Sequence, residues 1–126
     1  MIDCNNVLVL AYIGDAVYEV YIRNYLIKKN IVKVDKLQKE AVNLEYSAKS
    51  QRVFLEKLIN QNFFNQEEIA IIKRSRNHKG NRHPKNTDII TYKYATAFEA
   101  IIGYFYLTNN KKLDEMMNLI YDEDGR

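Results

Sequence analysis

Two carboxylates stand inside the most hydrophobic stretches of this sequence. Asp15 lies within LAYIGDAVYEV, residues 10–20, and Glu99 is the only acid within ATAFEAIIGYFYL, residues 95–107. Burying an unpaired charge among apolar side chains costs free energy. We therefore expect Asp15 to lose hydration, and we expect a basic partner, a bound proton or a metal ion to compensate for that loss.

The two acids could share a divalent cation. Two facing carboxylates repel, and Mg²⁺ would remove the repulsion, since it takes oxygen ligands and keeps several waters. A metal held by few protein groups leaves positions open for phosphate oxygens and a nucleophilic water, which is the chemistry of phosphodiester hydrolysis. The alternative is that each acid caps a neighbouring helix or pairs with an arginine. Glu19 is expected to pair with Arg23, four residues further along a helix.

Small residues accompany both acids, and they would let two helix backbones approach closely. They are Ala11, Gly14, Ala16, Ala95, Ala97, Ala100 and Gly103.

A basic segment, KRSRNHKGNRHPK at residues 73–85, carries the positive charge of the chain. It holds six of the 19 Lys and Arg residues, and its removal would leave 13 basic against 16 acidic residues. Such a concentration is typical of a protein that binds a polyphosphate, and the interspersed Asn and His side chains suit RNA. His78 and His83 lack a third ligand for zinc. The candidate RNA-binding residues are Arg74, Arg76, Asn77, His78, Lys79, Arg82 and Lys85. The alternative is a solvated loop that aids solubility.

Helical spacing dominates the chain, which has only four Gly and one Pro. The pattern predicts an all-α bundle of five to seven helices. The first long helix runs from about Val7 to Lys29 and the last from about Asp88 to Leu107. Both are apolar nearly all round, so they belong in the centre. The other expected helices are 36–43, one starting near Ser47, one capped by Asn65, and 113–120.

Length and composition indicate one domain, spanning 1–126. The single cysteine, Cys4, fits a reducing compartment. The uncharged runs are well short of the ~20 residues that a membrane helix needs. We expect a cytoplasmic protein that does not contact a membrane.

The motifs resemble those of the ribonuclease III family. LAYIGDAVYEVYIR resembles the helix that carries the family's metal-binding aspartate, and FEAIIGYFYL resembles the helix that carries its metal-binding glutamate. With SAKSQ at 47–51, KRSRN at 73–77 and PKNTD at 84–88, the chain is similar to Mini-ribonuclease III, the bacterial branch without a double-stranded-RNA-binding domain.

The resemblance implies a ribonuclease III-type helical fold and a Mg²⁺-dependent endoribonuclease that cuts double-stranded RNA. Asp15 and Glu99 would be the catalytic metal ligands. The products would have 5′-phosphate and 3′-hydroxyl ends, and the substrate would be the large-subunit ribosomal RNA precursor. The resemblance also implies a homodimer, and a ribosomal protein could present the RNA.

The sequence departs from the family's usual acids at three positions. Leu8, Ala11 and Thr96 stand where typical members have further carboxylates. The departures favour weaker Mg²⁺ binding. They also leave open an alternative, in which the chain is an inactive ribonuclease III-like domain that binds structured ribosomal RNA.

Overall fold

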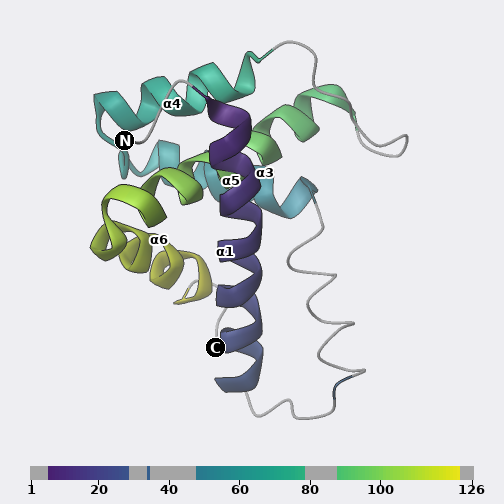
Figure 1. The fold of residues 1–126 in the computed structure, drawn as a ribbon, viewed down its shortest axis with the longest axis vertical. Coiled ribbons are helices and arrows are strands. Elements are labelled where there is room, and N and C mark those ends of the chain that lie inside the picture. Colours follow the sequence, from purple (N-terminus) through teal and green to yellow (C-terminus); the bar gives the residue numbers. More distant parts are fainter. Residues whose placement is uncertain (1–5, 29–33, 35–47, 79–87, 123–126) are drawn as a thin grey trace.

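The computed structural model describes residues 6–28, 34, 48–78 and 88–122, and these residues form five α-helices with no strand among them. The prediction of an all-α protein is therefore confirmed. Figure 1 shows the longest helix, α1 (Val7–Lys28), running down the molecule, with α5 (Ile89–Thr108) passing across its upper half. Figure 1 also shows α3 (Ala48–Asn60), α4 (Gln66–Arg76) and α6 (Asn110–Asp122) arranged around these two.

Helix α5 is the centre of the described fold, since it contacts each of the other four helices. Its sequence explains this position. Phe98, Ile101, Ile102 and Phe105 have no exposed surface, and the ring of Phe98 packs edge-on against that of Tyr18 on α1. Burying large apolar side chains on nearly every face of one helix supplies most of the stabilisation of a bundle. The prediction that both apolar helices lie in the interior holds for α5.

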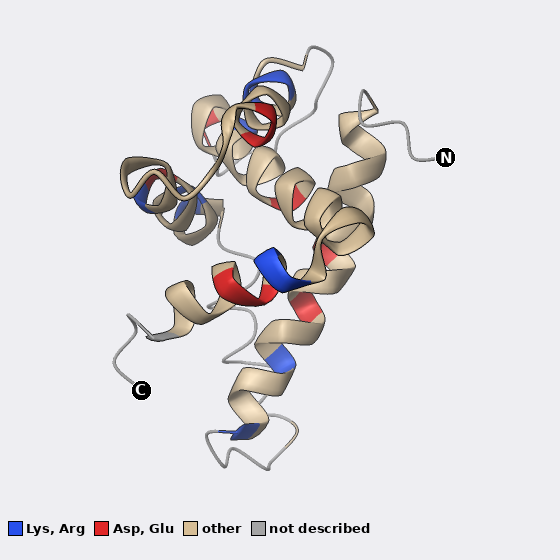
Figure 2. Cartoon of the chain, turned by 90° about the vertical axis from the view of Figure 1, so that its left-hand side faces the viewer, with Lys and Arg blue, Asp and Glu red and all other residues tan. Residues whose placement is uncertain are grey.

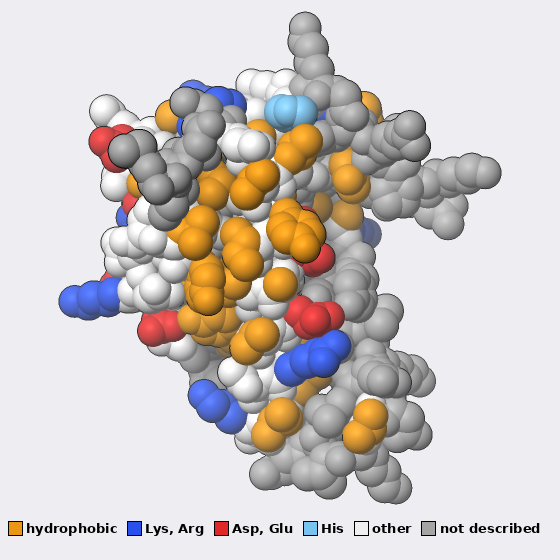
Figure 3. Space-filling model, in the orientation of Figure 1, with side chains coloured by type: hydrophobic (Ala, Val, Ile, Leu, Met, Phe, Trp, Pro, Cys, Tyr) orange, Lys and Arg blue, Asp and Glu red, His pale blue; other side chains and the backbone are white. Residues whose placement is uncertain are grey.

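Helix α1 is only partly enclosed. Leu10, Tyr18, Ile22 and Leu26 belong to the core, whereas Tyr12 is 80% exposed. Figure 3 shows hydrophobic side chains gathered over this outer face of α1. The rest of the chain covers only part of the apolar surface of α1. One apolar face of this helix therefore stays exposed.

The helix ends are fixed by polar side chains. Asn65 and Glu68 form a reciprocal capping box at the start of α4. Asp88 caps α5 by accepting a hydrogen bond from the backbone N–H of Thr91. That backbone hydrogen bond is the largest influence that holds the pKa of Asp88 below its ordinary value. The sequence predicted the Asn65 cap, and for α5 it left the cap open between Thr87 and Asp88.

Helix α6 joins the core through its buried apolar side chains, and polar contacts add to this attachment. Lys112 pairs with the buried carboxylate of Glu68, and its ammonium group lies over the rings of Phe63 and Phe105. Tyr21 of α1 donates a hydrogen bond to Asp114. Burial first, and then this hydrogen bond, raises the pKa of Tyr21.

The expected boundaries hold within one residue for the two long helices. The last helix begins at Asn110 and not at Leu113, because the side chain of Asn109 accepts a hydrogen bond from the backbone N–H of Lys112 and so caps an earlier start. The expected helix at 36–43 lies outside the described residues. Within the described ranges, no helix has the length and hydrophobicity needed to cross a membrane.

Candidate functional site

The α1–α5 crossing is a contact between two backbones. A Cβ atom built on Gly14 would lie 1.8 Å from the carbonyl oxygen of Glu99, and one built on Gly103 would lie 2.0 Å from that of Leu10. No side chain larger than hydrogen fits at either glycine unless the helices move apart. The close approach of the two helices that the small residues predicted is therefore present. Each helix has a glycine that contacts the backbone of the other helix.

This crossing sets where the two predicted acids lie. Asp15 directly follows Gly14, whose α-carbon rests against the backbone of Glu99. The two residues therefore belong to one junction of two rigid helices. Figure 2 shows acidic residues on both helices close to this crossing.

The expectation that Asp15 loses its hydration is wrong, because the side chain is exposed. Asp15 is exposed on α1, whereas Glu99 is half-buried on α5. An exposed and a half-buried carboxylate are hard oxygen donors that can hold Mg²⁺ together with its waters, so the residues present fit the expected ion.

The neighbouring positions add no further acid to this junction. Ala11 is buried, and Thr96 is buried with its hydroxyl group donating to the carbonyl oxygen of Tyr92 at 3.0 Å. Leu8 is 43% exposed. In the described part of the chain, His, Cys, Asp and Glu residues nowhere gather in threes that could hold a metal ion. The candidate ligand set there is the pair Asp15 and Glu99.

Glu19, one turn after Asp15, forms an ion pair with Arg23, with 3.2 Å between the carboxylate oxygen and the guanidinium nitrogen. This confirms the predicted pairing of Glu19.

The basic segment lies partly in α4, and its second half lies outside the residues that the structure describes. Its first four residues form the last turn of α4, which ends at Arg76. Cations are favoured at a helix C-terminus by the partial negative charge of its carbonyl groups. Arg74 and Asn77 are exposed, and Arg76 and His78 are half-buried. The other candidate RNA-binding residues, Lys79, Arg82 and Lys85, lie outside the described residues, as does His83.

The structure reveals a contact at Arg76 that the sequence analysis did not identify. The guanidinium carbon of Arg76 lies 5.3 Å from the ring centroid of Tyr94 on α5, and that of Arg52 on α3 lies 5.0 Å from the same centroid. We call these three residues the Tyr94 cluster. No spacing rule could predict it, because its members come from three helices.

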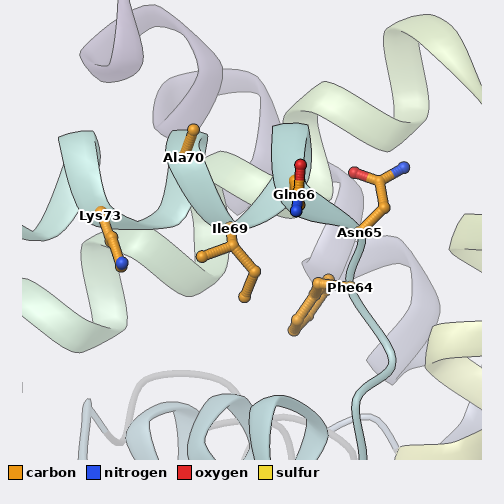
Figure 4. Close-up of a pocket in the computed structure, with 6 residues that line it drawn as sticks. All are labelled: Phe64, Asn65, Gln66, Ile69, Ala70 and Lys73. Atoms are coloured by element: carbon orange, nitrogen blue, oxygen red, sulfur yellow. The ribbon is translucent and has the colours of Figure 1, made fainter.

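A hollow of about 320 Å³ opens on the surface around α4 (Figure 4). Figure 4 shows Phe64, Ile69 and Lys73 directed to one side of the helix, with Ala70 on the other. Neither Asp15 nor Glu99 lines this hollow. The candidate acids thus lie at a helix crossing and outside this pocket.

Comparison with known proteins places the chain and its fold in a family. The ribonuclease III domain family matches residues 8–110, which include Asp15 and Glu99. The Mini-ribonuclease 3 of Clostridium tetani is 45% identical over 126 residues, covering 96% of this chain and 82% of the relative. That of Staphylococcus aureus is 44% identical over 117 residues, covering 91% and 86%. A crystal structure of a Fusobacterium nucleatum protein superposes with a TM-score of 0.80 at 33% identity, covering 94% of this chain and 93% of the other. The chain therefore belongs to the ribonuclease III family of endoribonucleases, in its Mini-ribonuclease III branch.

Proposed function

We propose that this chain is a single-domain, Mg²⁺-dependent endoribonuclease that cuts double-stranded RNA, with Asp15 and Glu99 as its metal ligands and catalytic residues. The observation that carries the proposal is the contact of Gly14 with the backbone of Glu99, because it joins the two acids through rigid helices. Family membership supplies the reaction class. The products would have 5′-phosphate and 3′-hydroxyl ends.

The roles of the residues follow from their exposure. Asp15 is exposed and can meet a polyanion as large as an RNA duplex, while Glu99 is half-buried and held by its helix. When Mg²⁺ is bound by this pair, it neutralises charge on the scissile phosphate and acidifies a water molecule. Arg74, Arg76, Asn77 and His78 at the end of α4, with Lys79, Arg82 and Lys85, would contact the phosphates and 2′-hydroxyl groups of the duplex.

A homodimer is the second part of the proposal, and the uncovered face of α1 supports it. Leu8, Val9, Tyr12 and Val20 are large hydrophobic residues that are 43–80% exposed. All four lie on α1, and Figure 3 shows hydrophobic side chains gathered over this helix with acidic side chains beside them. Contiguous exposed apolar surface marks interaction sites. We propose that a second copy of the chain covers this face, which would bring the acids of both copies to one duplex.

We also propose the large-subunit ribosomal RNA precursor as the substrate, with presentation by a ribosomal protein as an optional step. This part rests on the similarity to the Mini-ribonuclease 3 proteins. The cytoplasmic location expected from the cysteine content stays a prediction.

A second candidate function is an inactive domain that binds structured ribosomal RNA. The observation in its favour is that Ala11 and Thr96 supply no carboxylates to the junction. Cleavage of duplex RNA separates the two proposals. The nuclease requires Mg²⁺, and Asp15→Asn and Glu99→Gln each abolish cutting while duplex binding survives. Wild-type protein that binds duplex RNA but never cuts it establishes the binding domain instead.

A further inference from the structure

The guanidinium groups of two arginines, from two different helices, lie over the ring of Tyr94. The guanidinium of Arg52 comes from α3, and that of Arg76 comes from the last residue of α4. Arg76 also donates a hydrogen bond from Nη1 to the Tyr94 hydroxyl oxygen at 3.2 Å. A guanidinium over an aromatic ring is attracted to the negative face of the ring, more strongly when it is partly desolvated. Tyr94 therefore fixes the position of Arg76.

The two arginines differ in how their charge is balanced. Arg52 donates from Nη1 to the hydroxyl oxygen of Thr91 at 2.8 Å, and its Nε lies 3.5 Å from a carboxylate oxygen of Glu56. Thr91, the hydroxyl partner of Arg52, also donates its backbone N–H to the Asp88 carboxylate, so Arg52 lies near a second acid. For Arg76, the described ranges contain no ion pair. The cluster therefore carries one compensated cation and one whose charge the described chain leaves unbalanced.

The unbalanced guanidinium retains donors for a ligand. An arginine has five N–H donors in a fixed planar arrangement, and the described contacts of Arg76 occupy one of them. The remaining donors suit a phosphate, which a guanidinium binds in a bidentate manner. Holding the side chain in place beforehand reduces the conformational entropy that binding would otherwise cost.

We propose that Tyr94 is a positioning residue that holds Arg76 as a preorganised ligand for one phosphate of the RNA backbone, with Arg52 supporting Tyr94 from α3. This inference rests on the proposed function, and it adds Tyr94 and Arg52 to the interface. Tyr94 and Glu99 are five residues apart on α5, which places them about 8 Å apart along the helix axis. The residue that positions the phosphate ligand and the candidate metal ligand thus belong to the same helix.

A double-mutant cycle tests the proposal. Duplex RNA binding is measured over a range of salt concentrations, with EDTA present to prevent cutting, for wild type, Tyr94→Leu, Arg76→Ala and the double variant. We expect each single variant to bind about three- to tenfold more weakly. We also expect the slope of log K against log salt to fall by about one unit, the value for one phosphate contact. The double variant should bind no more weakly than Arg76→Ala, since Tyr94 acts through Arg76.

Two further variants separate positioning from a structural role. Tyr94→Phe keeps the ring and loses the hydroxyl group, so it should bind more tightly than Tyr94→Leu, and it replaces Tyr94→Leu in the cycle if that variant does not fold. Lys111→Ala removes an exposed charge on α6 and should leave the salt slope unchanged. Additive effects of Tyr94 and Arg76 overturn this inference alone. An unchanged slope in Arg76→Ala overturns it too and removes Arg76 from the proposed RNA contacts, but it leaves the proposed nuclease activity standing. Wild-type protein that does not bind duplex RNA overturns the proposed function, and this inference with it.

Discussion

The substitution Gly14→Ala should displace the two candidate ligands from each other. The added Cβ would lie 1.8 Å from the carbonyl oxygen of Glu99, whereas ordinary contact begins at 3.4 Å. The three nearest atoms are all backbone atoms of α5, so the helices must separate locally by roughly 1.5 Å to restore van der Waals distance. A shift of this size at a catalytic site costs on the order of 100-fold in rate.

The sign of the stability change tests the packing independently. Alanine is favoured over glycine in a helix by about 1 kcal/mol, so Gly14→Ala would stabilise α1 if nothing opposed the new methyl group. Inserting a methyl group into close-packed surroundings costs about 1–3 kcal/mol or more. We therefore expect net destabilisation by about 1 kcal/mol or more, measured by urea unfolding.

The assay is single-turnover cleavage of a duplex RNA at saturating Mg²⁺, at a temperature where the variants are folded. Ala16→Gly is the matched control, because Ala16 is exposed on the same helix and its loss of helix propensity is similar in size. The control should lose stability and keep its cleavage rate. A Gly14→Ala protein that is more stable than wild type and cuts at the wild-type rate would refute the argument from the helix crossing.

Three further predictions concern the surface, the ion pair and the pH dependence. Tyr12→Lys places a charge on the uncovered face of α1 and should convert a dimer to a monomer in sedimentation at micromolar concentration; an unchanged dimer would locate the interface elsewhere. Lys112→Met leaves the buried carboxylate of Glu68 without its cation and should lower the free energy of unfolding by about 3 kcal/mol. A loss under about 1 kcal/mol would mean that this ion pair behaves like a solvent-exposed one. Asp88 has a lowered pKa in the folded state, so its contribution to stability is present above its unfolded pKa of about 3.9 and is lost as the pH falls through the folded value. Urea unfolding of wild type and Asp88→Ala should therefore differ at pH 7 and converge at low pH; a constant difference would show that the carboxylate charge does not matter.

Local patterns in the sequence predicted the helices that the structure describes and the Asn65 cap, but not the Asn109 cap of α6. These features depend on contacts between residues a few positions apart, and sequence spacing determines such contacts directly. Examples are the caps Asn65 and Asp88, the long apolar helices and the Glu19–Arg23 pair. The small residues near the acids predicted the close contact of α1 with α5, because only such residues permit it.

Other features depended on the packing of distant segments. The apolar neighbours of Asp15 in sequence suggested burial, but they point to other sides of α1, and the carboxylate itself is exposed. The Tyr94 cluster joins α3, α4 and α5, so no periodicity within one helix could indicate it. The buried pair of Lys112 with Glu68 likewise links residues of two helices that only the fold brings together.

The central claim is that Asp15 and Glu99 act together on a metal ion to cut RNA. The most direct measurement compares wild type with Asp15→Asn on one end-labelled RNA duplex, with Mg²⁺ and with EDTA, scoring both cleavage and binding. We predict that wild type cuts only with Mg²⁺, and that Asp15→Asn binds the duplex but leaves it intact. Equal cutting by the two proteins, or cutting by wild type in EDTA, would contradict the account.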